Sequence, residues 1–178
     1  MNQEYANKLS LFSLFRRMLF RRIVLKKRDY NRYLPIADYL IDRWERAELM
    51  GFGKESSVYD SCLVLGDVTV GEKTWIGPYT ILDGSGKLII GNNCAISAGV
   101  HIYTHDSVKS ITEGKPIEHS PVIIGNNVYI GPNVVISKGV CIGDKAIIGA
   151  NSFVNSNVPH GEIVYGNPAK TKKEWEEK

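Results

Sequence analysis

The 178-residue sequence has no long apolar stretch, and none of its hydrophobic runs is long enough to cross a bilayer. Near its start the apolar residues are interrupted by two arginine pairs, Arg16-Arg17 and Arg21-Arg22, before the apolar segment of a secretory signal peptide develops. The sequence therefore predicts a cytoplasmic protein with no membrane-spanning helix.

Cysteine is also scarce. The chain has three cysteines, Cys62, Cys94 and Cys141, an odd number with no two of them close in the sequence. This pattern argues against a disulfide framework and against a zinc site built on thiolates. We expect reduced thiols in or near the hydrophobic core.

The sequence also lacks a large excess of charge of either sign, since its net charge is only +3. It is unevenly distributed: residues 1–50 carry eleven Lys and Arg against six Asp and Glu, which is +5 and leaves −2 for the rest. Two helices are predicted here, over residues 5–28 and 36–50, within an N-terminal segment of residues 1–53. They either cap the open end of the domain that follows or lie on an anionic membrane surface, whereas no motif indicates nucleic-acid binding.

The rest of the sequence has a period of six residues. Helices bring apolar residues together at spacings of three and four, and half-buried strands at two, so neither pattern explains this period. Hexapeptide repeats are typical of a parallel β-helix, in which three hexads form one coil. The repeated aliphatic residues are Val58, Val64, Val70, Ile76, Leu82, Ile90, Ile96, Ile102, Ile124, Ile130, Ile136, Ile142, Ile148 and Val154.

The repeat is interrupted at two places. A two-residue slip falls at Gly84-Ser85-Gly86, and a polar ten-residue insertion is predicted at residues 108–117. With these subtracted, residues 58–159 make five coils of eighteen residues. We therefore predict an all-β domain over residues 54–171 with one extruded loop, followed by a tail or short helix at residues 172–178. Gly-Asn-Asn at residues 91–93 and 125–127 suits tight corners.

The segment before the insertion, His101 to Ser107, holds the best candidate for catalysis. A neutral imidazole can remove a proton from a hydroxyl or an amine that attacks an acyl group, and His105 lies beside the loop. A carboxylate that orients the ring would be Asp83 or Asp106, although adjacent residues of a strand point to opposite faces, which disfavours Asp106. Spacing alone favours an ordinary surface histidine over a catalytic one at position 105.

The run from His105 through I-G-N-N-V-Y-I-G (residues 124–131) to G-N-P-A-K (residues 166–170) resembles the hexapeptide-repeat acetyltransferases. It is most similar to galactoside, maltose, nodulation-factor and surface-polysaccharide O-acetyltransferases, over residues 58–172. The resemblance implies a left-handed β-helix, a homotrimer with active sites between subunits, acetyl-coenzyme A as donor, and direct transfer with His105 as base. The residues that it implies for donor binding are Tyr129, Gly131, Ala150, Asn155, Lys170 and Lys173.

The sequence departs from this family at Pro132, which has no backbone N–H and cannot stabilise an oxyanion. The scaffold also resembles β-helical carbonic anhydrases, but His101 and His105 would lie about 13 Å apart on one strand, too far to share an ion. No metal is therefore expected.

Three functions remain open at this stage. The first is O-acetylation of a sugar hydroxyl, in surface polysaccharide or glycan biosynthesis at the inner membrane face, with Asp83 and Asp106 as candidate acceptor contacts. The second is N-acetylation of an amino sugar nucleotide. The third is a β-helix that is not catalytic or that resembles carbonic anhydrase.

Overall fold

The computed structural model describes residues 3–171, and side chains from residue 10 onward. The chain divides into two units, Met1–Asp42 and Arg43–Lys178. The first unit contains α1 (Gln3–Tyr30) and α2 (Ala37–Leu40), and the second begins with α3 (Arg43–Leu49). The predicted helix over residues 36–50 is thus two helices, because Ile41 is extended between them. The predicted tail at residues 172–178 lies outside the described residues.

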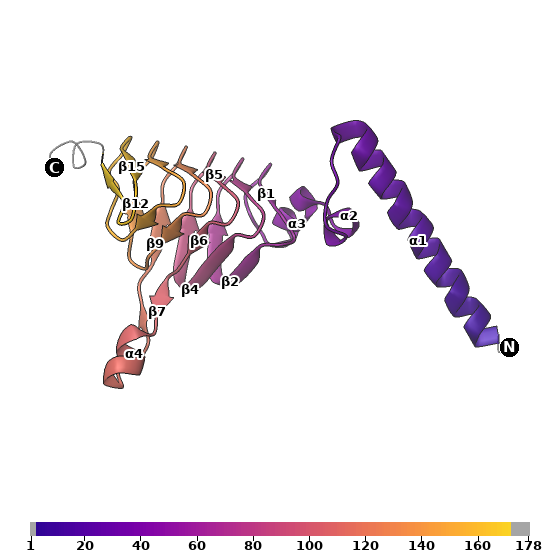
Figure 1. The fold of residues 1–178 in the computed structure, drawn as a ribbon, viewed down its shortest axis with the longest axis horizontal. Helices are drawn as coiled ribbons and strands as arrows, with labels where there is room; N and C mark the ends of the chain where they lie inside the picture. The colour runs from indigo at the N-terminus through magenta and orange to yellow at the C-terminus, as the bar shows by residue number, and fades with distance from the viewer. Residues whose placement is uncertain (1–2, 172–178) are drawn as a thin grey trace. The chain divides into compact units, whose positions relative to one another are not determined.

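The second unit is a parallel β-helix of very short strands, which confirms the predicted fold class (Figure 1). One sheet holds β1 (Ser57–Val58), β3 (Trp75–Ile76), β5 (Ala95–Ile96), β10 (Tyr129–Ile130), β13 (Ile147–Ile148), β15 (Ile163–Tyr165) and the antiparallel β16 (Lys170–Thr171). The other holds β2 (Leu63–Val70), β4 (Ile81–Ile90), β6 (His101–Ile102), β9 (Val122–Ile124), β11 (Val135–Ile136), β12 (Cys141–Ile142) and β14 (Phe153–Val154).

The stacked coils of the β-helix form a three-sided prism. The second sheet covers two sides of this prism because β2 and β4 bend around a corner. The first residues of β4 pair with β6, and its last residues pair with β9. The register between β2 and β4 shifts between Gly66 and Val68. This irregularity lies against the predicted slip at residues 84–86.

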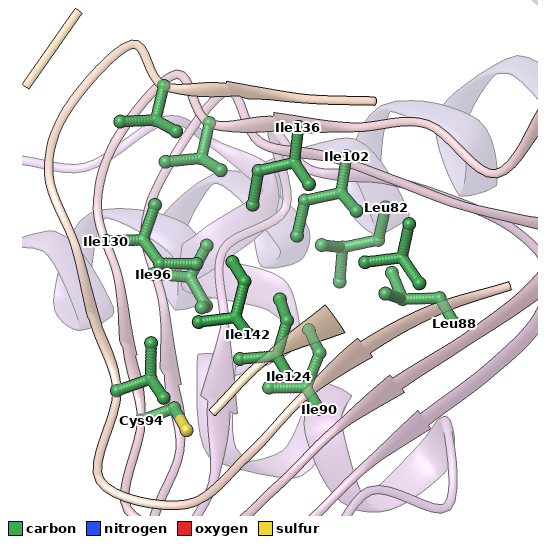
Figure 2. Packing of buried hydrophobic residues seen from close by; sticks show 14 of the residues in the cluster. Leu82, Leu88, Ile90, Cys94, Ile96, Ile102, Ile124, Ile130, Ile136 and Ile142 are labelled. Carbon is green, nitrogen blue, oxygen red and sulfur yellow. The ribbon is translucent and has the colours of Figure 1, made fainter. Parts of the chain in front are cut away.

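The hexad residues point inward and stack on the next coil, as the period predicts. Ile130 pairs with Ile96 on one side and Ile148 on the other, and all three are fully buried. Figure 2 shows these ladders converging in the interior of the prism. Asn93 and Asn127 have φ values of 53° and 58° at the corners, where the short side chain tolerates a left-handed backbone.

The prism has six coils rather than the five predicted. The first sheet stacks six parallel strands, and the sixth, β15, lies beyond residue 159, where the sequence count ended. At the opposite end α3 belongs to the same unit, with Ala47 and Phe52 joining the core beside Val58. This helix therefore covers apolar residues of the first coil.

The insertion is longer than predicted. Ala95 and Tyr129 are neighbours in the sheet although they are 34 positions apart, whereas a regular coil has 18 residues. This coil therefore has 16 additional residues rather than ten. The extra chain forms an arm: β7 (His105–Asp106), α4 (Val108–Glu113) and β8 (Glu118–His119), which projects from the prism (Figure 1). The strands β7 and β8 pair antiparallel with each other, so the residues on either side of the predicted loop belong to the arm and not to the repeat.

The cysteines differ from one another in exposure. Cys94 is buried and Cys62 is half-buried, as predicted, but Cys141 is exposed. On β12 its neighbour Ile142 points into the core, so Cys141 must point outward. The prediction of a core or near-core thiol was wrong for this residue.

Replacing Ile130 by alanine should lower the free energy of unfolding by about 2 to 5 kcal/mol, because the side chain is fully buried between two neighbouring coils. Ile111→Ala is the matched control, since Ile111 lies on α4 with 82% of its surface exposed. It should change stability by less than about 0.5 kcal/mol. Urea denaturation followed by circular dichroism measures both, and equal losses would contradict the inward ladder.

Candidate active site

The base of the arm brings His105 against the buried carboxylate of Asp83. His105 Nδ1 lies 2.7 Å from Asp83 Oδ2, although the two residues are 22 positions apart. Asp83 is on β4 and is only 1% exposed, whereas the His105 side chain on β7 keeps 36% of its surface exposed. The Nδ1 atom of the His105 ring therefore contacts a buried carboxylate, while the rest of the ring is partly exposed at the molecular surface.

Asp83 is held by several hydrogen bonds. Its Oδ1 accepts from the backbone N–H of Ser85 at 3.0 Å and from the Ser85 hydroxyl at 2.5 Å. Its Oδ2 accepts from Thr104 through the backbone N–H at 2.8 Å and the hydroxyl at 3.2 Å. Sequence reasoning missed both Ser85 and Thr104, although Asp-Gly-Ser at the slip was a signal for a local side-chain turn.

These donors decide the charge of Asp83. Burial alone would raise its pKa, but the hydrogen bonds from Ser85, Thr104 and His105 outweigh burial and hold the pKa far below its usual range. An ionised carboxylate only accepts hydrogen bonds, so His105 Nδ1 must carry the proton that it donates. In the neutral ring, Nε2 is then the nitrogen that accepts a proton.

Of the two carboxylates considered from the sequence, Asp83 is the one that contacts the ring. Asp106 points to the other side of β7, where its Oδ2 lies 2.8 Å from Lys138 Nζ. The hydrogen bond from Lys138 lowers the pKa of Asp106, and Lys138 also bonds Glu118 on β8 at 2.6 Å. One lysine of the prism thus joins both strands of the arm at its base.

Two further contacts fix the position of the arm. The rings of His105 and His119, which are directly opposite on β7 and β8, stack with centroids 5.7 Å apart. Gly86 of β4 passes under the arm, and a Cβ there would lie 2.4 Å from the carbonyl oxygen of Thr104. A side chain at position 86 would therefore push the arm away from β4.

The predicted donor-binding residues lie on other strands. Tyr129 is 46% exposed on the outer side of β10, and Gly131 follows it at a corner where a Cβ would lie 2.7 Å from the backbone nitrogen of Ala150. Gly131 is thus required for packing of the coils. Ala150 and Asn155 are exposed at later corners, and Pro132 is exposed beside Gly131.

Lys170 is half-buried on β16 and lines a cavity of about 240 Å³ at the C-terminal end of the prism, together with Pro159 and Ala169. Lys173 lies outside the described residues. Within one chain, the structure brings His105 onto Asp83 and packs Gly131 against Ala150. Among the residues that the structure describes, no group of three His, Cys, Asp or Glu has the arrangement of a metal site.

Comparisons with known proteins identify the repeats and the fold. Residues 121–156 match the family model described as bacterial transferase hexapeptide (six repeats). No curated protein matches the sequence at a significant level.

Several solved structures share the fold. A hexapeptide-repeat-containing acetyltransferase from Vibrio cholerae, solved with acetyl-coenzyme A, is 29% identical over 86% of this chain and 85% of its own, with a TM-score of 0.64. AntD, an N-acyltransferase from Bacillus cereus solved with dTDP and 3-hydroxybutyryl-CoA, is 26% identical over 71% and 74%, with a TM-score of 0.62. A galactoside acetyltransferase solved with coenzyme A is 21% identical over 87% and 79%, with a TM-score of 0.65, and shows the fold alone. The predicted resemblance to the hexapeptide-repeat acetyltransferases is confirmed by the matched repeats and by these structural neighbours.

The low pKa of Asp83 predicts a specific loss of stability in acid. A carboxyl group whose pKa is lower in the folded state stabilises the fold above its unfolded pKa, about 3.9, and loses that contribution as pH falls below it. Asp83→Asn should therefore be less stable than the wild type at pH 7, and the difference should shrink as pH falls below about 4. Urea denaturation across this range measures it, with Asp67→Asn as the control for an exposed aspartate. A constant difference would argue against an ionised Asp83.

Proposed function

We propose that this chain of bacterial transferase hexapeptide repeats acetylates a hydroxyl group of a sugar, with acetyl-coenzyme A as donor and His105 as general base. The observation that carries the proposal is the contact of 2.7 Å between His105 Nδ1 and the buried Asp83. The acyltransferase class and the coenzyme A donor are supported by the Vibrio and Bacillus enzymes, which were solved with acyl-coenzyme A.

The geometry supports direct transfer. His105 Nε2 takes the proton from the acceptor hydroxyl as its oxygen attacks the thioester carbonyl carbon, so a C–O bond forms and the C–S bond breaks. The imidazolium then returns the proton to the departing thiolate. The ionised Asp83 stabilises the imidazolium in between and keeps the ring in the tautomer that the reaction needs.

A site between subunits fits what a single chain displays. The outward residues of the first sheet form an exposed apolar column, in which Tyr129, Ile147 and Ile163 are 46%, 40% and 51% exposed. Exposed apolar surface of this kind is typical of an interface or a ligand groove. We propose that three chains associate so that the arm of one faces a neighbour, with the pantetheine arm of the donor along Tyr129 and its phosphates near Lys170.

N-acylation of an amino sugar nucleotide is the second candidate. It is favoured by a variant of AntD solved with dTDP-4-amino-4,6-dideoxyglucose and coenzyme A, 25% identical over 67% of this chain and 69% of its own. The same base serves both reactions, because an amine must also lose a proton. The ionised Asp83 stabilises the imidazolium in either reaction, so the acceptor must be identified by experiment.

His105→Ala should lower kcat by about 100-fold or more with any accepted sugar, because the proton acceptor is lost. Its KM for acetyl-coenzyme A should stay near the wild-type value. His160→Ala is the matched control, since His160 is exposed at the exit from the prism. Thiol release from acetyl-coenzyme A measures turnover, and full turnover of His105→Ala would refute the assignment of the base.

The acceptor class is tested with pairs of nucleotide sugars that carry a hydroxyl or an amine at the same carbon. Acetyl-coenzyme A should first raise the midpoint of thermal unfolding, because it binds only the folded protein. We expect thiol release with the hydroxyl sugar and a product that mild alkali hydrolyses, as an ester is. Turnover of the amino sugar alone, with an alkali-stable amide product, would overturn O-acetylation in favour of N-acylation.

A further inference from the structure

The N-terminal half of α1 carries an uncovered apolar face. Leu11, Leu14, Phe15 and Met18 follow the spacing that places residues on one side of a helix, and they are 67%, 64%, 42% and 45% exposed. Ser10, Ser13, Arg17 and Arg21 follow the same spacing on an adjacent side of the helix. The half-helix is therefore amphipathic, with its apolar face open.

The two halves of α1 differ in their contacts within the first unit. In the C-terminal half, Arg22 donates hydrogen bonds to the carbonyl oxygens of Tyr39 and Leu40 at 2.7 and 3.0 Å, and Lys26 bonds Asp42 at 2.6 Å. The segment around α2 thus holds this half through polar contacts. The exposed large apolar residues before Phe20 have no comparable cover.

The long central part of α1 carries charge of one sign only. Between Tyr5 and Arg28 there are eight basic residues and no aspartate or glutamate. Arg16, Arg17 and Arg21 flank the apolar face, and a shallow cavity lined by these arginines, Phe12 and Phe20 lies along the helix. Such a surface suits a partner that is negatively charged and apolar at once.

We propose that the N-terminal half of α1 lies on the surface of an anionic lipid bilayer, with Leu11, Leu14, Phe15 and Met18 at the acyl boundary and the arginines among the headgroups. A second copy of the helix fits less well, because it would bring arginines together and residues 5–28 include no acidic residue to pair them. In the described part of the chain no helix is long and apolar enough to cross a membrane, so the contact is peripheral. The proposal goes beyond acyl transfer and does not depend on it.

Co-sedimentation of the full-length protein with vesicles tests the proposal. Binding should be strong to phosphatidylcholine with about 30% phosphatidylglycerol and weak to phosphatidylcholine alone, and should fall in about 0.5 M salt. The triple variant Arg16→Gln, Arg17→Gln, Arg21→Gln should bind about 100-fold more weakly, at roughly fivefold for each charge. The double variant Leu11→Ser, Phe15→Ser should lose binding even though its charge is unchanged.

The matched control is Lys54→Gln, Lys87→Gln, Lys145→Gln, which removes three exposed charges from the second unit and should bind like the wild type. All variants should keep the unfolding midpoint of the β-helix, which separates lost binding from misfolding. Equal binding of the arginine triple variant and the wild type would overturn the proposal. A smaller oligomer for Leu11→Ser, Phe15→Ser, with unchanged vesicle binding, would also overturn it and assign the face to a second copy of the chain.

Discussion

Every coil of the prism must place a branched apolar side chain inward at each third of its circumference, and the structure depends on this constraint. Ile76, Ile102 and Ile124 are fully or almost fully buried, and each packs on equally buried residues one coil away. Because the strands are only two or three residues long in most coils, few side chains are available to correct an error in register. A two-residue excess is accommodated as a register shift in β4, whereas the longer insertion leaves the prism as the arm.

The arm carries the candidate catalytic histidine. The sixteen additional residues leave the prism after Ile102, and the first strand of the arm carries His105. The slip in β4 provides the partner, since Asp83 and Ser85 lie where the backbone departs from the hexad pattern. Both irregularities lie at the same corner, so the places where the repeat fails are also the places where polar side chains meet.

The local electrostatics explain why this corner is stable. A buried carboxylate is costly unless its oxygen atoms are satisfied, and Asp83 accepts from Ser85, Thr104 and His105. On the opposite side of β7, Lys138 of the prism bonds Asp106 and Glu118 and holds the two arm strands together. The ring of His105 is thus positioned by buried hydrogen bonds on one side and by surface ion pairs on the other.

The sequence by itself determined the period, the inward residues and the corners, because a six-residue repeat has one register that buries Ile130 and its equivalents throughout. It also led to His105 as the candidate base, through the family resemblance. Only the tertiary structure decided the length of the arm, because the hexad count cannot distinguish two true hexads from the strands β7 and β8. It alone showed that Asp83, with Ser85 and Thr104, holds the ring of His105, while Asp106 binds Lys138. Contacts between residues 22 positions apart depend on how the coils stack and not on local spacing.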